Sequence, residues 1–293
     1  MISAASSMQL RTILVAVSGG AASQEAINAA CRLARRFESH LEGMHVAVHP
    51  EVPNWPASRT ATRALSDAIR READAAAATA RQMFDAAADR HGLPLIDAER
   101  RSSVSIWGAS ACWRQETGLD TRAVARRARL FDLVVLGRSS RAVRQASSLT
   151  VEHTLLEAGR PVLVVGAPAL EKLGDAIALA WNDTAQASRA LSAAMPLLKD
   201  ASRTHILCFG DARMGELLQQ LEWYGIRATG HRFPPLSRQR VETGELLLAA
   251  TRDCQADLLV MGAYGHAPWW ESLFGGATRE VLNKESFPIL LAH

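Results

Sequence analysis

A short pattern occurs twice in the chain, as Asp-Leu-Val-Val-Leu-Gly at 132–137 and as Asp-Leu-Leu-Val-Met-Gly at 257–262. In both copies a continuous apolar run ends at a glycine, which is typical of a strand buried on both faces of a parallel sheet. Aligning the copies brings the two halves of the chain into register as an internal repeat. The sequence therefore predicts two related α/β domains, and its 293 residues are enough for both.

The rest of the chain alternates between strand patterns and helical periodicity. Strands are expected at 11–18, 41–48, 101–107, 132–137, 161–165, 176–181, 205–209, 226–233, 258–261 and 288–292. Helices are expected at 23–37, 60–90, 120–130 (capped by Asp120), 151–158, 185–198, between 209 and 226, and at 242–252. A linker with Gly and Pro flanks at 166–174 places the domains at 9–166 and 174–293. Each domain is expected to be a doubly wound, parallel five-stranded sheet with helices on both faces.

The segment 257–282 is rich in glycine. Gly262, Gly265, Gly275 and Gly276 follow the apolar run, and 278–283 has the pattern of a helix start. Main-chain N–H groups that glycine leaves uncovered, next to a helix N-terminus, make a site for phosphate. The spacing G-x2-G-x9-G-G-x-T fits neither the lysine-bearing P-loop nor the tight dinucleotide turn. The glycines alone leave open a phosphate site and a plain connection.

This spacing resembles the nucleotide-binding signature of the universal stress protein family, G-x2-G-x9-G-[S/T]. Gly262, Gly265 and Gly275 fall on its three glycines, Gly276 falls on the Ser or Thr, and Thr278 falls on a second hydroxyl position. In the first half the same alignment keeps Gly137 but gives Ser140 and Thr150 for the other glycines; counting back from Pro161 instead gives Ser148 or a neighbour for the last one. That loop is either a packing element or an anion site made of arginine side chains.

The family also carries V-D-G-S after its first strand. The counterparts are Val17-Ser-Gly-Gly20 in the first half and Trp181-Asn-Asp-Thr184 in the second. Asn182 in place of Asp can both donate and accept a hydrogen bond. Trp181 is either a core residue or a platform for the adenine ring. In family members that bind ATP, strand-two main chain reads the adenine edge, which here places that role near Cys208.

The resemblance implies a tandem, cytoplasmic stress-response protein with the adenine nucleotide alpha hydrolase-like fold. Its second domain would bind ATP or a related adenine nucleotide, with Mg²⁺ as a companion of the nucleotide, and would be regulatory, with slow ATP hydrolysis at most. The two domains would form an intrachain pseudo-dimer through their closing strands, and a homodimer stays open. The alternative is an interaction or scaffold module with vestigial pockets. The expected binding residues are Trp181, Asn182, Asp183, Cys208, Gly262, Gly265, His266, Gly275, Gly276 and Thr278.

Other classes of function find less support in the sequence. The net charge of +3 gives no strong field for nucleic acid or an anionic membrane, so the arginine clusters read either as solvated helix faces or as a nucleic-acid surface. No apolar run approaches the roughly 20 residues of a bilayer span, and we expect a cytoplasmic location. The four cysteines form no C-x-x-C pair and Glu152-His153 has no second histidine at metalloprotease spacing, so no metal site is predicted. His266 is either a phosphate ligand or a solvated loop residue, and no catalytic residue is assigned.

Overall fold

The computed structural model describes residues 9–47, 59–97, 108–117, 122–138, 144–166, 172–210, 212–234, 240–263 and 287–293. The chain divides into two compact units. The first holds Arg11–Ala158, and the second holds Gly159–His293 together with Met1–Leu10. Among the described residues, none of the helices combines the length and the hydropathy that a bilayer span requires.

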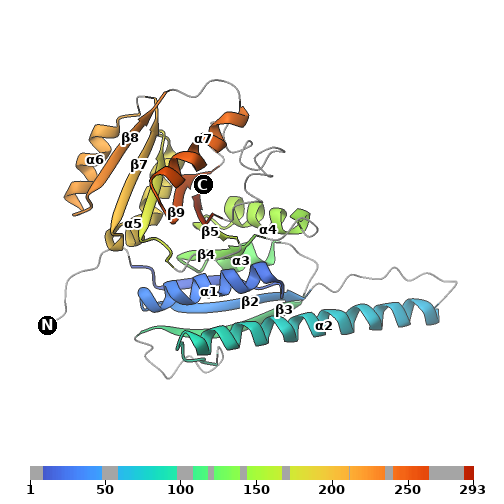
Figure 1. Ribbon diagram of the computed structural model, residues 1–293. Helices are drawn as coiled ribbons and strands as arrows, with labels where there is room; N and C mark the ends of the chain where they lie inside the picture. The colour runs from blue at the N-terminus through green and yellow to red at the C-terminus, as the bar shows by residue number, and fades with distance from the viewer. Residues whose placement is uncertain are drawn as a thin grey trace. The chain divides into compact units, whose positions relative to one another are not determined.

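The unit 11–158 is a parallel sheet with helices packed on it (Figure 1). Its strands are β1 Thr12–Ala16, β2 His40–Ala47, β3 Ser110–Thr117 and β4 Leu133–Gly137, in the spatial order β3-β2-β1-β4. Its helices are α1 Ala21–Arg36, α2 Arg59–Arg90, α3 Ala123–Ala128 and α4 Arg144–Glu157. The central strands are apolar because both faces are covered: Ile13, Leu14 and Val134 are fully buried.

The long helix α2 packs on β2 and β3 at the end where its buried side chains lie. Phe84 of α2 lies directly against Gly43 of β2, where an added Cβ would come within 2.5 Å of the aromatic ring. Glycine at this strand position therefore lets an aromatic side chain fill the space next to the sheet. The predicted bounds 60–90 agree closely with the observed Arg59–Arg90.

The unit 159–293 contains a parallel five-stranded sheet with one antiparallel strand added. Its strands are β5 Val162–Val165, β6 Ala176–Trp181, β7 Arg203–Phe209, β8 Ala228–Phe233, β9 Leu258–Gly262 and β10 Ile289–Ala292, in the order β5-β10-β9-β6-β7-β8. Its helices are α5 Ala185–Asp200, α6 Met214–Trp223 and α7 Arg240–Asp253. All pairs are parallel except β5 with β10, where Leu163 faces Leu290. The predicted α/β class is confirmed, with a mostly parallel, mixed sheet.

Three local predictions fall on segments outside the described residues. The third strand is Ser110–Thr117, whereas the expected segment 101–107 lies outside the described residues. β3 is an edge strand whose second half alternates exposed polar residues, so it lacks the continuous apolar run used to find strands. Helix α3 begins after Arg122 without a side-chain cap, and Asp120 lies outside the described residues. The expected helix start at 278–283 lies outside them as well.

Candidate functional site

The order of strands in the unit 159–293 places a switch point between β6 and β9. From β6 the chain passes through α5 to β7 on one side, whereas β9 is followed by β10 on the other side. Because these strands are parallel, the carboxyl ends of β6 and β9 meet at the same edge of the sheet. Ligands of open α/β sheets bind in the crevice outside such a pair of strand ends. The predicted residues Trp181, Asn182, Asp183 and Gly262 all fall at this edge.

Gly262 at the end of β9 lies against the first turn of α5. An added Cβ would come within 2.5 Å of the Gln186 carbonyl carbon and 2.6 Å of the Ala187 amide nitrogen. Gly137 at the end of β4 is crowded in the same way, with the Ala22 carbonyl in α1 as its nearest contact. Backbone atoms of a helix cannot rotate aside as a side chain can. The first glycine in each copy of the repeat therefore lets a helix begin close to a strand end.

The turn between β6 and α5 has a left-handed residue at its centre. Asp183 has φ +56°, and its counterpart in the first unit, Gly19, has φ +87°. These are the two residues that the sequence alignment places on the Gly of V-D-G-S. A left-handed backbone costs a non-glycine residue roughly 1 kcal/mol or more, although Asp tolerates it better than most residues. The matching conformation supports the internal repeat.

Thr184 connects this turn to the helix. Its Oγ1 accepts a hydrogen bond from the Ala187 amide at 3.3 Å, which caps the N-terminus of α5. The same hydroxyl donates to Asn182 Oδ1 at 2.7 Å. The oxygen of the Asn182 amide is thereby engaged within the turn, and its orientation is fixed. The Asn182 NH₂ group is the part of this side chain that carries donors for a ligand.

The carboxylate of Asp183 is paired with a guanidinium. Arg213 Nε donates to Asp183 Oδ2 and Arg213 Nη2 to Oδ1, each at 2.7 Å. These hydrogen bonds from Arg213 hold the pKa of Asp183 below its ordinary value, and they raise the pKa of Arg213. Arg213 precedes α6 with φ +46° and also lies 3.4 Å from Glu216 Oε2. The negative charge at the turn is therefore balanced locally by one arginine.

Trp181 and Cys208 are held by neighbouring segments. The indole Nε1 of Trp181 donates to the Ala212 carbonyl at 2.7 Å, so the ring is attached to the segment before α6. Cys208 is buried opposite Trp181 in the β6–β7 ladder, and its Sγ lies 3.7 Å from the Gly210 carbonyl. The Gly210 amide donates to the Phe233 carbonyl at 3.0 Å. This amide belongs to the main chain that we expected to contact the adenine edge, and it is already hydrogen-bonded to β8.

Five predicted site residues cannot be placed in this way. Gly265, His266, Gly275, Gly276 and Thr278 lie outside the described residues. The structure thus brings four of the predicted residues to the edge between β6 and β9 and places Cys208 at the end of the next strand. Sequence analysis missed two participants of the turn, the capping hydroxyl of Thr184 and the cation of Arg213. Arg213 had no local signal, because its partner is 30 residues away.

The equivalent turn of the unit 11–158 is closed by its own hydroxyls. Ser23 Oγ accepts from the Ser18 amide at 2.9 Å and lies 2.9 Å from Ser18 Oγ. The buried His45 Nδ1 lies 2.7 Å from the Val17 carbonyl. Ser18 stands where the family carries Asp, and its amide and its hydroxyl both contact Ser23 Oγ within the turn. This unit therefore has the same backbone framework with different chemistry at the strand end.

Comparison with known proteins supports one fold family. Residues 9–105 match the model of the universal stress protein family. A universal stress protein from Archaeoglobus fulgidus DSM 4304 is 14% identical, with a TM-score of 0.66 over 97% of this chain and 96% of its own. A Pseudomonas aeruginosa UCBPP-PA14 protein described as a universal stress protein is 16% identical, with a TM-score of 0.50 over 97% and 93%. The family match confirms the predicted resemblance over residues 9–105, and these two structures confirm the fold.

A universal stress protein solved in complex with cAMP is 19% identical and covers 53% of this chain and 96% of its own, with a TM-score of 0.35. No curated protein matches the sequence.

Proposed function

We propose that this chain, in which residues 9–105 match the universal stress protein family, binds ATP or a related adenine nucleotide in its unit 159–293. One observation carries the proposal. The switch point between β6 and β9 coincides with a left-handed turn at Asp183 and with the start of the glycine-rich segment at Gly262. A doubly wound sheet offers its ligand site at this kind of edge.

In this proposal, different residues contact the ribose and the phosphates of the nucleotide. The amide of Asn182 and the β6–α5 turn would face the ribose side, with Trp181 beside them. The main-chain N–H groups of the segment containing Gly265, Gly275 and Gly276 would hold phosphate, helped by the hydroxyl of Thr278 and by His266. The paired charges of Asp183 and Arg213 add no net negative charge that would repel a phosphate. Mg²⁺, as part of this proposal, would be bound mainly by the phosphates of the nucleotide.

The chemistry of the site favours binding over turnover. The carboxylate of Asp183 is held by two hydrogen bonds from Arg213, and its lowered pKa makes it a poor proton acceptor. The proposal is therefore a regulatory nucleotide-binding protein with slow ATP hydrolysis at most. A role in a cytoplasmic stress response, an intrachain pseudo-dimer and the absence of nucleic-acid binding are further parts of the proposal.

Calorimetric titration of ATP into the purified full chain tests the site. We expect one saturable binding event per chain, which the Gly265→Asp variant abolishes, because a carboxylate would occupy the path of the phosphates. The matched control is Ser140→Asp, the counterpart in the first half, which should bind as the unchanged protein does. Absence of heat at millimolar ATP, or equal binding by the Gly265→Asp variant, would contradict the proposal.

The alternative function, a scaffold with vestigial pockets, has its own support in the structure. The Gly210 amide is hydrogen-bonded to β8, the Trp181 indole is hydrogen-bonded to the Ala212 carbonyl, and the Ser18 amide is hydrogen-bonded within its turn. These contacts occupy groups that an adenine nucleotide would use. Protein purified without added nucleotide separates the two functions: a bound adenine compound released on denaturation supports nucleotide binding, and a scaffold releases none.

A further inference from the structure

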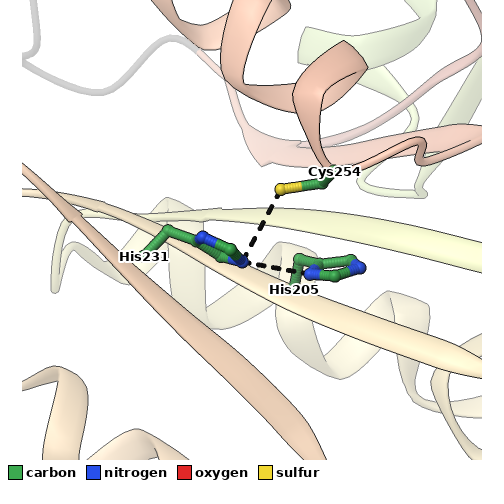
Figure 2. A group of neighbouring side chains, drawn as sticks. All are labelled: His205, His231 and Cys254. Atoms are coloured by element: carbon green, nitrogen blue, oxygen red, sulfur yellow. Dashed lines mark hydrogen bonds between the residues drawn. The ribbon is translucent and has the colours of Figure 1, made fainter.

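Three side chains with metal-binding atoms meet in the unit 159–293, away from the edge between β6 and β9. His205 lies on β7, His231 lies on β8, and Cys254 directly follows α7. Figure 2 shows the two imidazole rings side by side on the strands, with the sulfur of Cys254 approaching them from the end of the helix. The three potential ligand atoms all lie within 4.8 Å of one another.

The distances between these atoms are close to those in a tetrahedral site. His205 Nδ1 and His231 Nε2 lie 3.0 Å apart, and Cys254 Sγ lies 3.6 Å from His231 Nε2. Zinc bonds of about 2.0–2.1 Å to nitrogen and about 2.3 Å to sulfur place two nitrogens about 3.4 Å apart and a nitrogen and a sulfur about 3.6 Å apart. An ion would therefore require the two rings to separate by a few tenths of an ångström and Cys254 Sγ, which lies within 4.8 Å of both rings' ligand atoms, to lie about 3.6 Å from His205 Nδ1 as well.

The strand register explains why the two histidines share a face. His205 is paired with Thr229, and His231 is two residues further along β8, so both rings project from the same side of the sheet. Helix α7 packs on β7 and brings Cys254 to this side. The opposite face of β8 belongs to α6, because Gly230 lies against Met214 and Leu218.

The position of Cys254 is fixed from both directions. The helix ends in a left-handed residue, Gln255 with φ +52°, whose amide donates to the Arg252 carbonyl at 2.7 Å. Arg203 of β7 donates to Gln255 Oε1 at 3.4 Å and to the Gln255 carbonyl at 3.5 Å. The C-terminal end of a helix carries partial negative charge, which favours a cation beside it. The backbone next to Cys254 is therefore held by the helix end and by Arg203.

From this geometry we propose that His205 Nδ1, His231 Nε2 and Cys254 Sγ bind one transition-metal ion of the zinc class, with the fourth position left to water or another ligand. Two imidazoles and one thiolate are the ligand types that zinc and copper take, whereas magnesium and calcium take oxygen ligands. The fixed register of two strands with a helix end is typical of sites built on rigid elements.

The hydrogen bonds within the cluster leave part of the His205 ring unsatisfied. His205 Nε2 is buried and has no hydrogen-bond partner among the described residues, so hydrogen bonding within the cluster does not satisfy this ring. The competing arrangement is a hydrogen-bonded His–His–Cys cluster that binds no ion.

The test is zinc binding by the full chain without any affinity tag, stripped with a chelator and measured in competition with a chromophoric zinc chelator. We expect one zinc ion per chain. The variants His205→Ala, His231→Ala and Cys254→Ser should each lose at least about 100-fold in affinity, because even the loss of a residue behind the ligands costs 10–100-fold. Cobalt in place of zinc should give a thiolate-to-metal charge-transfer band that Cys254→Ser removes.

Matched controls lie in the other unit: His91→Gln removes a half-buried imidazole and Cys31→Ala removes a buried thiol, and neither should change zinc affinity. Should the ligand variants fold poorly, alkylation of Cys254 in the unchanged protein gives an independent measurement, since bound zinc should protect this thiol from the reagent. Failure to retain zinc against the chelator, or equal zinc affinity in Cys254→Ser and the unchanged protein, would overturn the site in favour of the hydrogen-bonded cluster. These experiments need no nucleotide, so their outcome is independent of the proposed function.

Discussion

Removal of the Arg127 guanidinium should destabilise the unit 11–158 by about 3 kcal/mol, because it leaves a buried carboxylate without its main partner. Arg127 Nε and Nη2 donate to the two oxygens of Glu42, each at 2.7 Å. The Glu42 side chain is fully buried, and the Arg127 side chain is 19% exposed. Hydrogen bonding to Glu42 raises the pKa of Arg127, as expected of a cation stabilised by its partner.

The magnitude follows from what remains after the substitution Arg127→Ala. Breaking a buried ion pair costs about 3–5 kcal/mol. Arg114 Nε stays 3.3 Å from Glu42 Oε1, although its side chain is 36% exposed and its attraction is weakened by solvent. This second cation places the expected loss at the lower end of the range. Replacing both partners, as Glu42→Leu with Arg127→Met, should return the stability to within about 1 kcal/mol of the unchanged protein, since the buried carboxylate is then gone and the remaining Arg114 is 36% exposed to solvent.

Hydrogen exchange of peptides from β1 and β2 is the suitable assay, because it reads the stability of this unit separately from the other. A loss of about 3 kcal/mol corresponds to about 100-fold faster exchange of the slowest amides. A change below about fivefold in Arg127→Ala would refute the reasoning, because it would mean that Arg114 or solvent suffices for Glu42. A double variant no more stable than the single one would refute the assignment of the cost to the unpaired charge.

Two further substitutions test packing and protonation. Gly262→Ala should lower the free energy of urea unfolding by about 2 kcal/mol, because the added Cβ meets the backbone of Gln186 and Ala187. The control Gly215→Ala in α6 has open space around its Cβ and should not destabilise the protein. Equal effects of the two substitutions would contradict the packing role of Gly262. Burial and three nearby arginines lower the pKa of His91 from 6.5, so its contribution to stability is present above about pH 6.5 and is lost as the pH falls through the folded pKa. His91→Gln should flatten the decrease of the urea midpoint below pH 6.5, and an unchanged pH profile would contradict this.

The sequence was most informative where a signal is local and repeated. The apolar runs ending at Gly137 and Gly262 predicted β4 and β9, and the alignment placed Gly19 and Asp183 at the same turn position, where both are left-handed. These features depend on backbone geometry and burial over a few neighbouring residues. The sequence expressed them directly, as glycine and as continuous apolar character.

Contacts between distant segments could not be read in the same way. The histidines of the proposed metal site are 26 residues apart and Cys254 follows His231 by 23, so neither pair has the close spacing by which metal sites are recognised. The expectation of no metal site arose from that lack of spacing. The edge strand β3 was not predicted for a related reason: Arg114, Gln115 and Glu116 pair with β2 through the backbone and leave no apolar pattern.

The crowding at Gly137 and Gly262 means that these glycines are required for folding, whether or not a ligand is bound. A mutation at either position meets the main chain of a helix, so selection for folding alone would retain both glycines after any ligand has been abandoned. A first glycine retained in a diverged copy is therefore explained by packing alone and is not by itself evidence of a ligand.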